Sequence, residues 1–361
     1  MTDPAWFRAQ FPVFERRAFM NAGSEGPVPR RAADAVRERV RHELEGGRGG
    51  GPYFLALLEL ATTLRGRCAA LLGCDTDEVA LTGSTTDGIN TVVQGLDLRP
   101  GDEIITTDEE HPGLLAPLAL AQRRRGVAIR IVPWDELAGA VGAKTRLIAC
   151  SHVSWVSGRV IDTEALAATG TPLLLDGAQG LGAIPVEVRA LGCDFYAASG
   201  QKWLCGPTGS GCLFLKCERT DELLVPWPGY GSLADPQDPL AFAPAEGAAR
   251  FDVGFPSGIR STWALASLDL FDEAGWDWVH ERGRVLAARL AEALAERGFD
   301  VSPRGPTTLV SWSAQDAEGQ VEHLRELGII VRHLPGRGLV RASAGAWSCE
   351  EDVERLARLA T

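Results

Sequence analysis

Short apolar runs recur along the chain between residues 78 and 216. Seven of them have the length of a strand: Glu78–Thr82, Glu103–Thr107, Ile129–Trp134, Arg146–Ser151, Pro172–Asp176, Phe195–Ser199 and Gly211–Lys216. The runs are apolar throughout and do not alternate with polar residues, which is typical of strands buried on both faces. Helical stretches separate the early runs, so the pattern predicts an α/β fold with a mainly parallel seven-stranded sheet covered by helices.

Helical patterns flank this region on both sides. Before it, the sequence predicts helices over Val28–Glu45 and Tyr53–Leu72, joined by a flexible glycine-rich connector at Gly46–Pro52. After it, the sequence predicts a helical region over Thr262–Arg297 that is split near Gly275. Helices therefore both precede and follow the sheet-forming segment.

The C-terminal part alternates short strands and helices up to a closing helix at Glu350–Leu359. This alternation predicts a smaller α+β unit. A connector rich in proline, glycine and alanine, Val225–Arg250, separates it from the sheet-forming segment. We therefore predict an N-terminal arm (1–20) that packs with the small domain, a large domain (21–250) and a small C-terminal domain (251–361).

The composition is that of an ordinary globular chain and argues against several classes of partner. The 361 residues carry a formal net charge of -12, and 45% of them are hydrophobic. Nucleic acids and anionic membranes bind basic surfaces, so we expect neither as a partner. No apolar run approaches the roughly 20 residues that span a bilayer. The N-terminus lacks the pattern of a signal peptide, which predicts a cytoplasmic location.

The eight cysteines do not have the spacing of a zinc site, so we expect no metal. In a chain of this size without a signal peptide, they are interpreted as reduced and mostly buried thiols. Cys205 lies close to a candidate site lysine, Lys202, and we interpret it as a packing residue.

Lysine is almost absent from the chain. Only three of the 36 cationic residues are lysines, namely Lys144, Lys202 and Lys216, and the others are arginines. Arginine replaces lysine well as a surface charge, but it cannot lose its proton and attack a carbonyl group. Lys202, in the segment SGQKWLCGP, is therefore a candidate nucleophile.

Polar side chains follow four of the predicted strands where each strand ends. The turn GSTTDGIN contains Thr85 and Thr86 and precedes a helix. It is either a phosphate site made of helix amides and hydroxyls or a plain N-cap. His111 follows the next strand, Asp176 closes a fully apolar strand and needs a cationic partner, and Lys202 follows another strand.

The carboxyl ends of parallel strands meet at one edge of a sheet, so we expect these four groups to lie together. Together they offer a phosphate site, a flat ring that can stack, a buried acid and a rare lysine. This set fits pyridoxal 5'-phosphate. The phosphate of that cofactor needs amides and hydroxyls, its pyridine nitrogen needs an anion, and its aldehyde needs an amine.

The same segments resemble the class V aminotransferase family of pyridoxal-phosphate enzymes, which includes the cysteine desulfurases. The resemblance rests on DGAQ (176–179), SGQKW (199–203) and the GPTGSG that follows, with GSTTDGIN and EHPG in the family's order. It extends from FMNAGSEGPVP (19–29) to the final helix. The resemblance implies a fold type I α/β structure and a homodimer with active sites at the subunit interface.

The resemblance also gives each candidate residue a role. Lys202 would bind the cofactor aldehyde and move the proton at the substrate Cα, and Asp176 would pair with the ring nitrogen. Gln179 would hydrogen-bond the phenolic oxygen of the ring, and His111 would stack on the ring face. The phosphate would be held by Thr85, Thr86, Ser199 and Gln201. Arg341 would clamp the substrate α-carboxylate, and Asn21 would border the same pocket.

The sequence differs from the desulfurase pattern at several positions, and these differences bear on its activity. Those enzymes hold a persulfide on a mobile-loop cysteine shortly before the clamp arginine, but the loop Arg332–Arg341 has no cysteine. Trp155 stands where desulfurases usually have asparagine, and it would either wall the substrate pocket or pack in the core. Gln201 replaces the histidine common in desulfurases and keeps a donor that does not titrate. SHVSW and GQKWLCGP resemble the cystine/cysteine C–S lyase branch.

We therefore expect a pyridoxal-phosphate lyase that cleaves the C–S bond of a cysteine- or cystine-type amino acid by β-elimination, without a persulfide-relay cysteine. The same residues also suit a class V aminotransferase that uses a 2-oxo acid, an amino-acid racemase or epimerase, or a non-catalytic pyridoxal-phosphate-binding protein. In the family, a threonine of the partner subunit reaches the phosphate. Here that place corresponds to Phe255, and whether the nearby Ser257 compensates is open.

Overall fold

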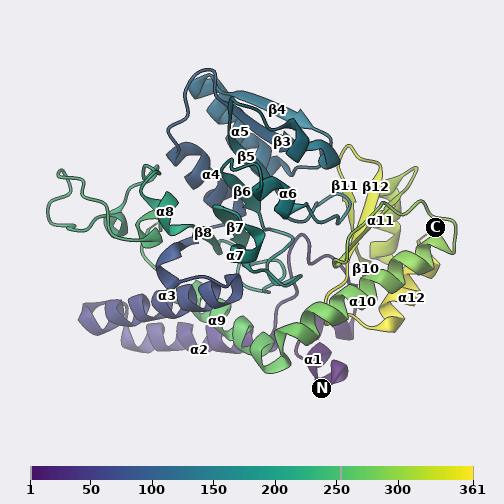
Figure 1. The fold of residues 1–361 in the computed structure, drawn as a ribbon. Coiled ribbons are helices and arrows are strands. Elements are labelled where there is room, and N and C mark those ends of the chain that lie inside the picture. The colour runs from purple at the N-terminus through teal and green to yellow at the C-terminus, as the bar shows by residue number, and fades with distance from the viewer. Residues whose placement is uncertain (1, 253, 361) are drawn as a thin grey trace.

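A seven-stranded sheet forms the centre of the computed structural model, which describes residues 2–252 and 254–360 (Figure 1). Its strands are β2 (Val79–Thr82), β3 (Glu103–Thr107), β4 (Ala128–Val132), β5 (Thr145–Ser151), β6 (Leu173–Asp176), β7 (Phe195–Ser199) and β8 (Gly211–Leu215). They lie in the order β2-β8-β7-β6-β5-β3-β4, and β8 runs antiparallel to both of its neighbours. The prediction of a mainly parallel seven-stranded sheet is confirmed.

Adjacent residues of the central strands pack on opposite faces of this sheet. Leu174 packs among residues of α4 (Thr85–Gly95) and α5 (Pro112–Arg125), whereas Leu175 packs among residues of α3 (Gly50–Leu72). Both leucines are fully buried. A strand with helices on each side has no solvent-facing positions, which explains why the strand sequences are continuously apolar.

The glycine-rich connector is shorter than the sequence predicts. Helix α2 (Arg30–Gly46) and helix α3 include most of the glycines, so only residues 47–49 lie outside the two helices. The predicted loop over Gly46–Pro52 is therefore wrong in extent. Glycine costs little at helix ends, where a turn of positive φ is needed, and Gly47 has a φ of 77°.

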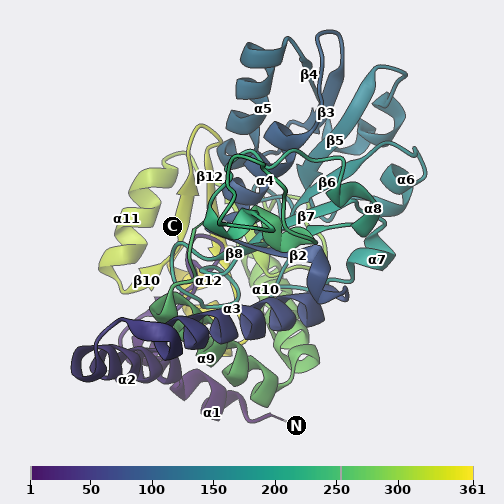
Figure 2. The same ribbon diagram turned by 90° about the vertical axis from the view of Figure 1, so that its left-hand side faces the viewer.

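The predicted break near Gly275 is confirmed. Helix α9 (Gly258–Ala274) ends there and α10 (Trp276–Ala295) begins directly after it, and Gly275 has a φ of 86°. Helix α9 packs against α2 and α3 along one side of the molecule (Figure 2).

The C-terminal unit contains a three-stranded antiparallel sheet. Its order is β11 (Arg332–Leu334), β12 (Leu339–Ser343) and β9 (Leu309–Ser313), and it packs with α10, α11 (Ala317–Glu326) and α12 (Glu350–Leu359). The N-terminal segment joins this unit through β1 (Ala18–Phe19), which pairs in parallel with β10 (Ile329–Ile330). The remaining helices are α1 (Pro4–Ala9), α6 (Thr163–Ala167), α7 (Val188–Leu191) and α8 (Cys217–Thr220).

The arm before β1 packs on the C-terminal unit. Phe7 of α1 contacts Trp278 edge-to-face, and Arg8 forms an ion pair with Asp352 at 2.6 Å. The domain boundaries at residues 20 and 250 stay predictions. Among the residues described, no helix is both long enough and apolar enough to cross a membrane.

Candidate active site

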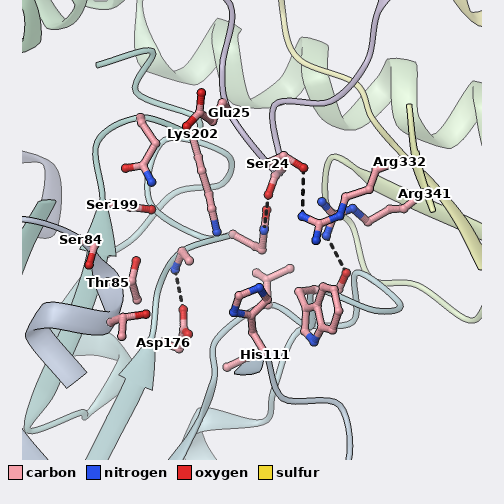
Figure 3. Close-up of a pocket in the computed structure, with 18 residues that line it drawn as sticks. Ser24, Glu25, Ser84, Thr85, His111, Asp176, Ser199, Lys202, Arg332 and Arg341 are labelled. Carbon is pink, nitrogen blue, oxygen red and sulfur yellow. Dashed lines mark hydrogen bonds between the residues drawn. The ribbon is translucent and has the colours of Figure 1, made fainter. Parts of the chain in front are cut away.

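A cavity of about 360 Å³ lies between the carboxyl ends of the large-sheet strands and the β11–β12 hairpin (Figure 3). The predicted site residues that line it are Thr85, Thr86, His111, Trp155, Asp176, Gln179, Ser199, Gln201, Lys202 and Arg341. Asn21 does not line it. The sequence did not single out several other lining residues, which include Ser24, Glu25, Ser84, Ser151 and Arg332.

One end of the cavity offers unpaired hydroxyls from the start of α4 and the end of β7. Ser84 caps α4, and its hydroxyl accepts a hydrogen bond from the Asp87 backbone N–H, so the plain N-cap interpretation holds for Ser84. The hydroxyls of Thr85 and Ser199 are buried and have no partner within the described residues. Buried hydroxyls are normally satisfied, so this end is suited to an anionic ligand.

Lys202 and Asp176 face the same cavity (Figure 3). Burial lowers the pKa of Lys202 to about 8, against the attraction of Asp176, which raises it. Burial raises the pKa of Asp176, whereas the charge of Lys202 and the Ala178 backbone N–H at 2.9 Å favour its ionised form. A lysine with this pKa has a much larger neutral fraction near pH 7 than an exposed lysine, as a nucleophilic amine requires.

His111 is held as a neutral ring. It caps α5, and its Nδ1 accepts a hydrogen bond from the Gly113 N–H at 3.0 Å. Burial and, to a smaller extent, the nearby cations Lys202 and Arg332 lower the pKa of His111 to about 4. The ring meets Trp155 edge-to-face, with centroids 4.9 Å apart. A neutral, fixed imidazole can cover the face of a flat ligand.

Arg341 is fully buried without an acidic partner among the described residues. Its Nη1 donates to the Trp155 carbonyl oxygen at 2.8 Å, while Nε and Nη2 have no partner there. Burial and, to a smaller extent, the neighbouring Arg332 lower the pKa of Arg341 to about 9. A buried cation is costly unless it is paired, so this position is suited to an anion supplied by a ligand.

Arg332 is the main cavity residue that the sequence reasoning missed. In the β11–β12 hairpin it lies directly opposite Arg341, so both guanidinium groups reach the cavity (Figure 3). It donates to the Ser24 hydroxyl at 3.2 Å and lies over the Trp155 ring, 5.9 Å from its centroid. The hairpin-like sequence RHLPGRGLVR was the available signal, because a four-residue turn at 335–338 pairs its two ends.

Two other predicted site residues form hydrogen bonds within the protein. Asn21 accepts a hydrogen bond from the Ser24 hydroxyl at 2.8 Å, so it supports the Ser24–Arg332 contact from outside the cavity. The Gln179 amide donates to the Gly23 carbonyl at 2.8 Å and accepts from the Trp203 indole at 3.0 Å. One N–H of Gln179 is left for a ligand.

Cys205 is a buried residue of the turn after Lys202. Burial raises its pKa well above the ordinary value, and its carbonyl accepts from the Trp263 indole at 2.9 Å and the Ser267 hydroxyl at 3.0 Å. A protonated, inaccessible thiol is inert, which agrees with its interpretation as a packing residue.

A family model and several curated proteins match this chain over most of its length. The family model "Aminotransferase class-V" matches residues 27–356. A cysteine desulfurase of Salmonella typhimurium is 30% identical over 97% of this chain and 95% of its own. A probable cysteine desulfurase of Methanothermobacter thermautotrophicus is 29% identical over 78% of this chain and 74% of its own.

Solved structures are similar over nearly the whole chain. The cystine C–S lyase C-DES, in complex with its product cysteine persulfide, has a TM-score of 0.91 and 27% identity, covering 97% of this chain and 99% of its own. A cysteine desulfurase from Thermococcus onnurineus has a TM-score of 0.88 at 23% identity, covering 99% of this chain and 97% of its own. The second likeness shows the fold alone.

Proposed function

The chain belongs to the class V aminotransferase family of pyridoxal-phosphate enzymes, and on this basis we propose that it cleaves the Cβ–S bond of cystine or a related S-substituted cysteine. The substrate class is supported by its similarity to the cystine C–S lyase C-DES. The observation that carries the choice of cystine is the pair of guanidinium groups in the cavity.

Arg332 and Arg341 lie side by side without a carboxylate that pairs with either in the described part of the chain. One arginine is enough to bind the α-carboxylate of an ordinary amino acid. A second one next to it suits a substrate with two carboxylates, because each guanidinium can then form a charge-assisted hydrogen-bonded pair. Cystine has two carboxylates and a carbon–sulfur bond between them.

The arrangement of the thiols supports direct elimination over a persulfide relay. No cysteine is among the described residues that line the cavity, and the hairpin that carries both arginines contains none. All eight cysteines are free thiols, which is consistent with an enzyme of the reducing cytoplasm.

The residues of the cavity fit pyridoxal phosphate. We assign the phosphate to the unpaired hydroxyls of Thr85, at the start of α4, and Ser199, at the end of β7. We assign the ring nitrogen to Asp176 and the ring face to His111. Thr86 and Gln201 line the cavity and complete the predicted phosphate set. When bound, the cofactor supplies an electron sink for the pair released at the substrate Cα.

Side chains of this protein bind the substrate and move the proton. Arg341 binds the α-carboxylate and Arg332 binds the distal carboxylate, which orients the Cα–H bond and the sulfur. Lys202, once free as a neutral amine, removes the Cα proton as the Cβ–S bond breaks. The balanced reaction converts cystine and water into cysteine persulfide, pyruvate and ammonia.

Measuring pyruvate tests this proposal. The protein loaded with pyridoxal phosphate is incubated with cystine, cysteine and S-substituted cysteines, and pyruvate is quantified with a coupled dehydrogenase. We expect most product from cystine. Absence of pyruvate from every one of these substrates contradicts the proposed function.

Transamination is the second candidate, because Lys202 could return the proton to the cofactor instead of completing elimination. A shift to the pyridoxamine absorbance on adding an amino donor, reversed by a 2-oxo acid, would favour it. An exchange of the Cα proton without a net product would favour a racemase or epimerase. An absorbance band that responds to no amino acid would favour a non-catalytic binding protein.

The substitution Arg332→Gln should change KM for a substrate with two carboxylates much more than KM for a substrate with one. We expect KM for cystine to rise about tenfold or more, because one charge-assisted pair is lost. For S-methylcysteine, which has a single carboxylate, we expect a change below about threefold. Steady-state kinetics on both substrates provide the measurement.

Arg337→Gln is the matched control for this substitution. Arg337 lies in the turn of the same hairpin, but it is exposed and donates to the Asp108 carbonyl at 2.8 Å. We expect its KM values to stay near those of the wild type. An equal rise for both substrates in Arg332→Gln would exclude Arg332 as the site of the second carboxylate.

We further propose that two copies of the chain form the active enzyme. An exposed apolar surface on α3 and the segment before α9 supports this, with exposed fractions of 47% for Phe54, 61% for Leu55, 46% for Leu58 and 46% for Phe255. Phe54 and Phe255 contact each other edge-to-face at 5.6 Å. Ser257 caps α9 and accepts from the Arg260 N–H, and its contact with a partner's phosphate stays a prediction.

Light scattering tests the dimer. We expect twice the mass of one chain for the wild type and a single-chain mass for Leu55→Glu, because a buried carboxylate without a partner opposes association. Ile131→Glu, at a 56% exposed position on the edge strand β4, serves as the control. A wild-type monomer with full activity would contradict the proposal.

A further inference from the structure

Trp155 occupies the seam between the two parts of the structure. It lies in the loop after β5 and is 7% exposed. Its neighbours in this loop are bound to the C-terminal unit: the Val156 carbonyl accepts from Ser311 Oγ at 2.5 Å, and the Gly158 carbonyl accepts from Thr307 Oγ1 at 2.8 Å. The loop is therefore fixed to the unit that carries the arginine hairpin.

Three residues of the cavity make contact with Trp155. The indole ring meets the edge of His111 at 4.9 Å and lies under the Arg332 guanidinium at 5.9 Å. Its backbone carbonyl accepts the hydrogen bond from Arg341. Trp155 also belongs to a small buried cluster with Val156 of the same loop and Leu334 of the β11–β12 hairpin. Trp155 thus contacts His111, which we assign to the cofactor ring face, and both arginines that we assign to the substrate carboxylates.

We propose that Trp155 is the specificity-determining residue of this site, because its indole ring holds Arg332 at the place where the second carboxylate binds. The inference rests on the proposed function and adds the device that selects a dicarboxylate. Arg332 has no acidic partner among the described residues, so the Ser24 hydroxyl and the Trp155 ring are what fix its guanidinium. The Ser24 hydroxyl fixes one nitrogen of the guanidinium, and the indole face of Trp155 adds a second constraint on its orientation.

The backbone and the side chain of Trp155 have separable functions. Arg341 is bound by the carbonyl oxygen, which every residue at position 155 retains. Arg332 and His111 are bound by the ring, which asparagine or leucine would remove. Side-chain substitutions should therefore weaken the binding of the second carboxylate while leaving the α-carboxylate clamp in place.

Ligand binding tests this without turnover. The probes are 2,7-diaminosuberate, which has both carboxylates of cystine but no sulfur, and norleucine, which has one. Calorimetry on the loaded enzyme gives a dissociation constant for each. In the wild type we expect diaminosuberate to bind at least about tenfold more tightly than norleucine, and in Trp155→Asn and Trp155→Leu we expect most of this preference to be lost. The norleucine constant should change less than about threefold.

Trp155→Phe is the conservative variant. It keeps an aromatic face under Arg332 and an edge against His111, so we expect it to keep the preference within about threefold. The kinetics should agree, with KM for cystine raised in the asparagine and leucine variants and KM for S-methylcysteine nearly unchanged. The use of two non-aromatic variants keeps the test valid if one of them does not fold.

The outcomes separate this inference from the function on which it rests. If the wild type does not prefer diaminosuberate, the two-carboxylate function is wrong whatever Trp155 does. If the wild type has the preference and the asparagine and leucine variants retain it, the assignment of Trp155 alone is wrong. Loss of the preference in Trp155→Phe as well would also overturn it, because an aromatic ring would then not be sufficient.

Discussion

Replacing Lys202 with alanine reduces pyruvate release by about 10³-fold or more, while the protein still folds. The substitution removes both the amine that binds the cofactor aldehyde and the base that takes the Cα proton, and each contribution to rate is large. The measurement is the single-turnover rate with cystine, together with the absorbance of the bound cofactor. A circular dichroism melt establishes that the variant is folded.

The two other lysines of the chain provide matched controls. Lys144 is exposed, and Lys216 lies 3.9 Å from Glu218 at the surface, so alanine at either position should leave the rate unchanged. Lys202→Arg should be as inactive as the alanine variant, because a guanidinium keeps its proton. An active arginine variant would rule out Lys202 as the nucleophile.

The pKa of Lys202 also sets a pH dependence. Burial lowers this pKa to about 8, so the neutral fraction of the amine increases as the pH rises through that value. The rate at which the cofactor-free protein takes up pyridoxal phosphate should therefore rise with pH and level off above about 8. Stopped-flow absorbance follows the uptake directly.

Replacing Asp176 with asparagine should lower turnover by about 10²-fold or more and weaken cofactor binding. An amide cannot keep the ring nitrogen protonated, so the electron sink is lost. Asp176 also raises the pKa of Lys202, so in the variant this pKa should fall below about 8 and the uptake profile should move to lower pH. Fluorescence titration of the cofactor and the uptake profile are the two measurements.

Asp194→Asn is the control for this second substitution. Asp194 is also nearly buried and bound to a cation, with Arg219 Nε at 2.9 Å, but it lies at the amino end of β7, at the opposite edge of the sheet. We expect it to reduce thermal stability without moving the uptake profile. If Asp194→Asn shifted that profile as much as Asp176→Asn, the effect would be one of general stability.

The sequence predicted best those features that depend on local pattern. Strands β3 and β7 have the predicted bounds, because each is a continuous apolar run between polar turns. His111, Asp176 and Lys202 were found for a related reason, since each is the polar residue at the end of such a run. Parallel strands then bring these ends together without further information.

Features that depend on pairing between distant segments could not be predicted in the same way. Arg332 enters the cavity because the β11–β12 register places it opposite Arg341, and the hairpin-like sequence around it does not by itself give that register. Asn21 was expected to border the carboxylate pocket, but it does not line the cavity and instead accepts a hydrogen bond from the Ser24 hydroxyl. The connector at 46–52 was predicted too long, because Gly46, Gly50 and Gly51 lie at the ends of α2 and α3, where the weak helix propensity of glycine costs little.

The unpaired buried charge of Arg341 has a consequence for attempts to raise the stability of the protein. A fully buried guanidinium beside a second one destabilises the unliganded fold, and an apolar residue of similar size often stabilises such a position. Arg341→Met should therefore be recovered readily in any selection for thermostability, and it would be inactive. Directed evolution of this chain needs an activity screen at every round, because the most accessible gain in stability lies in its substrate clamp.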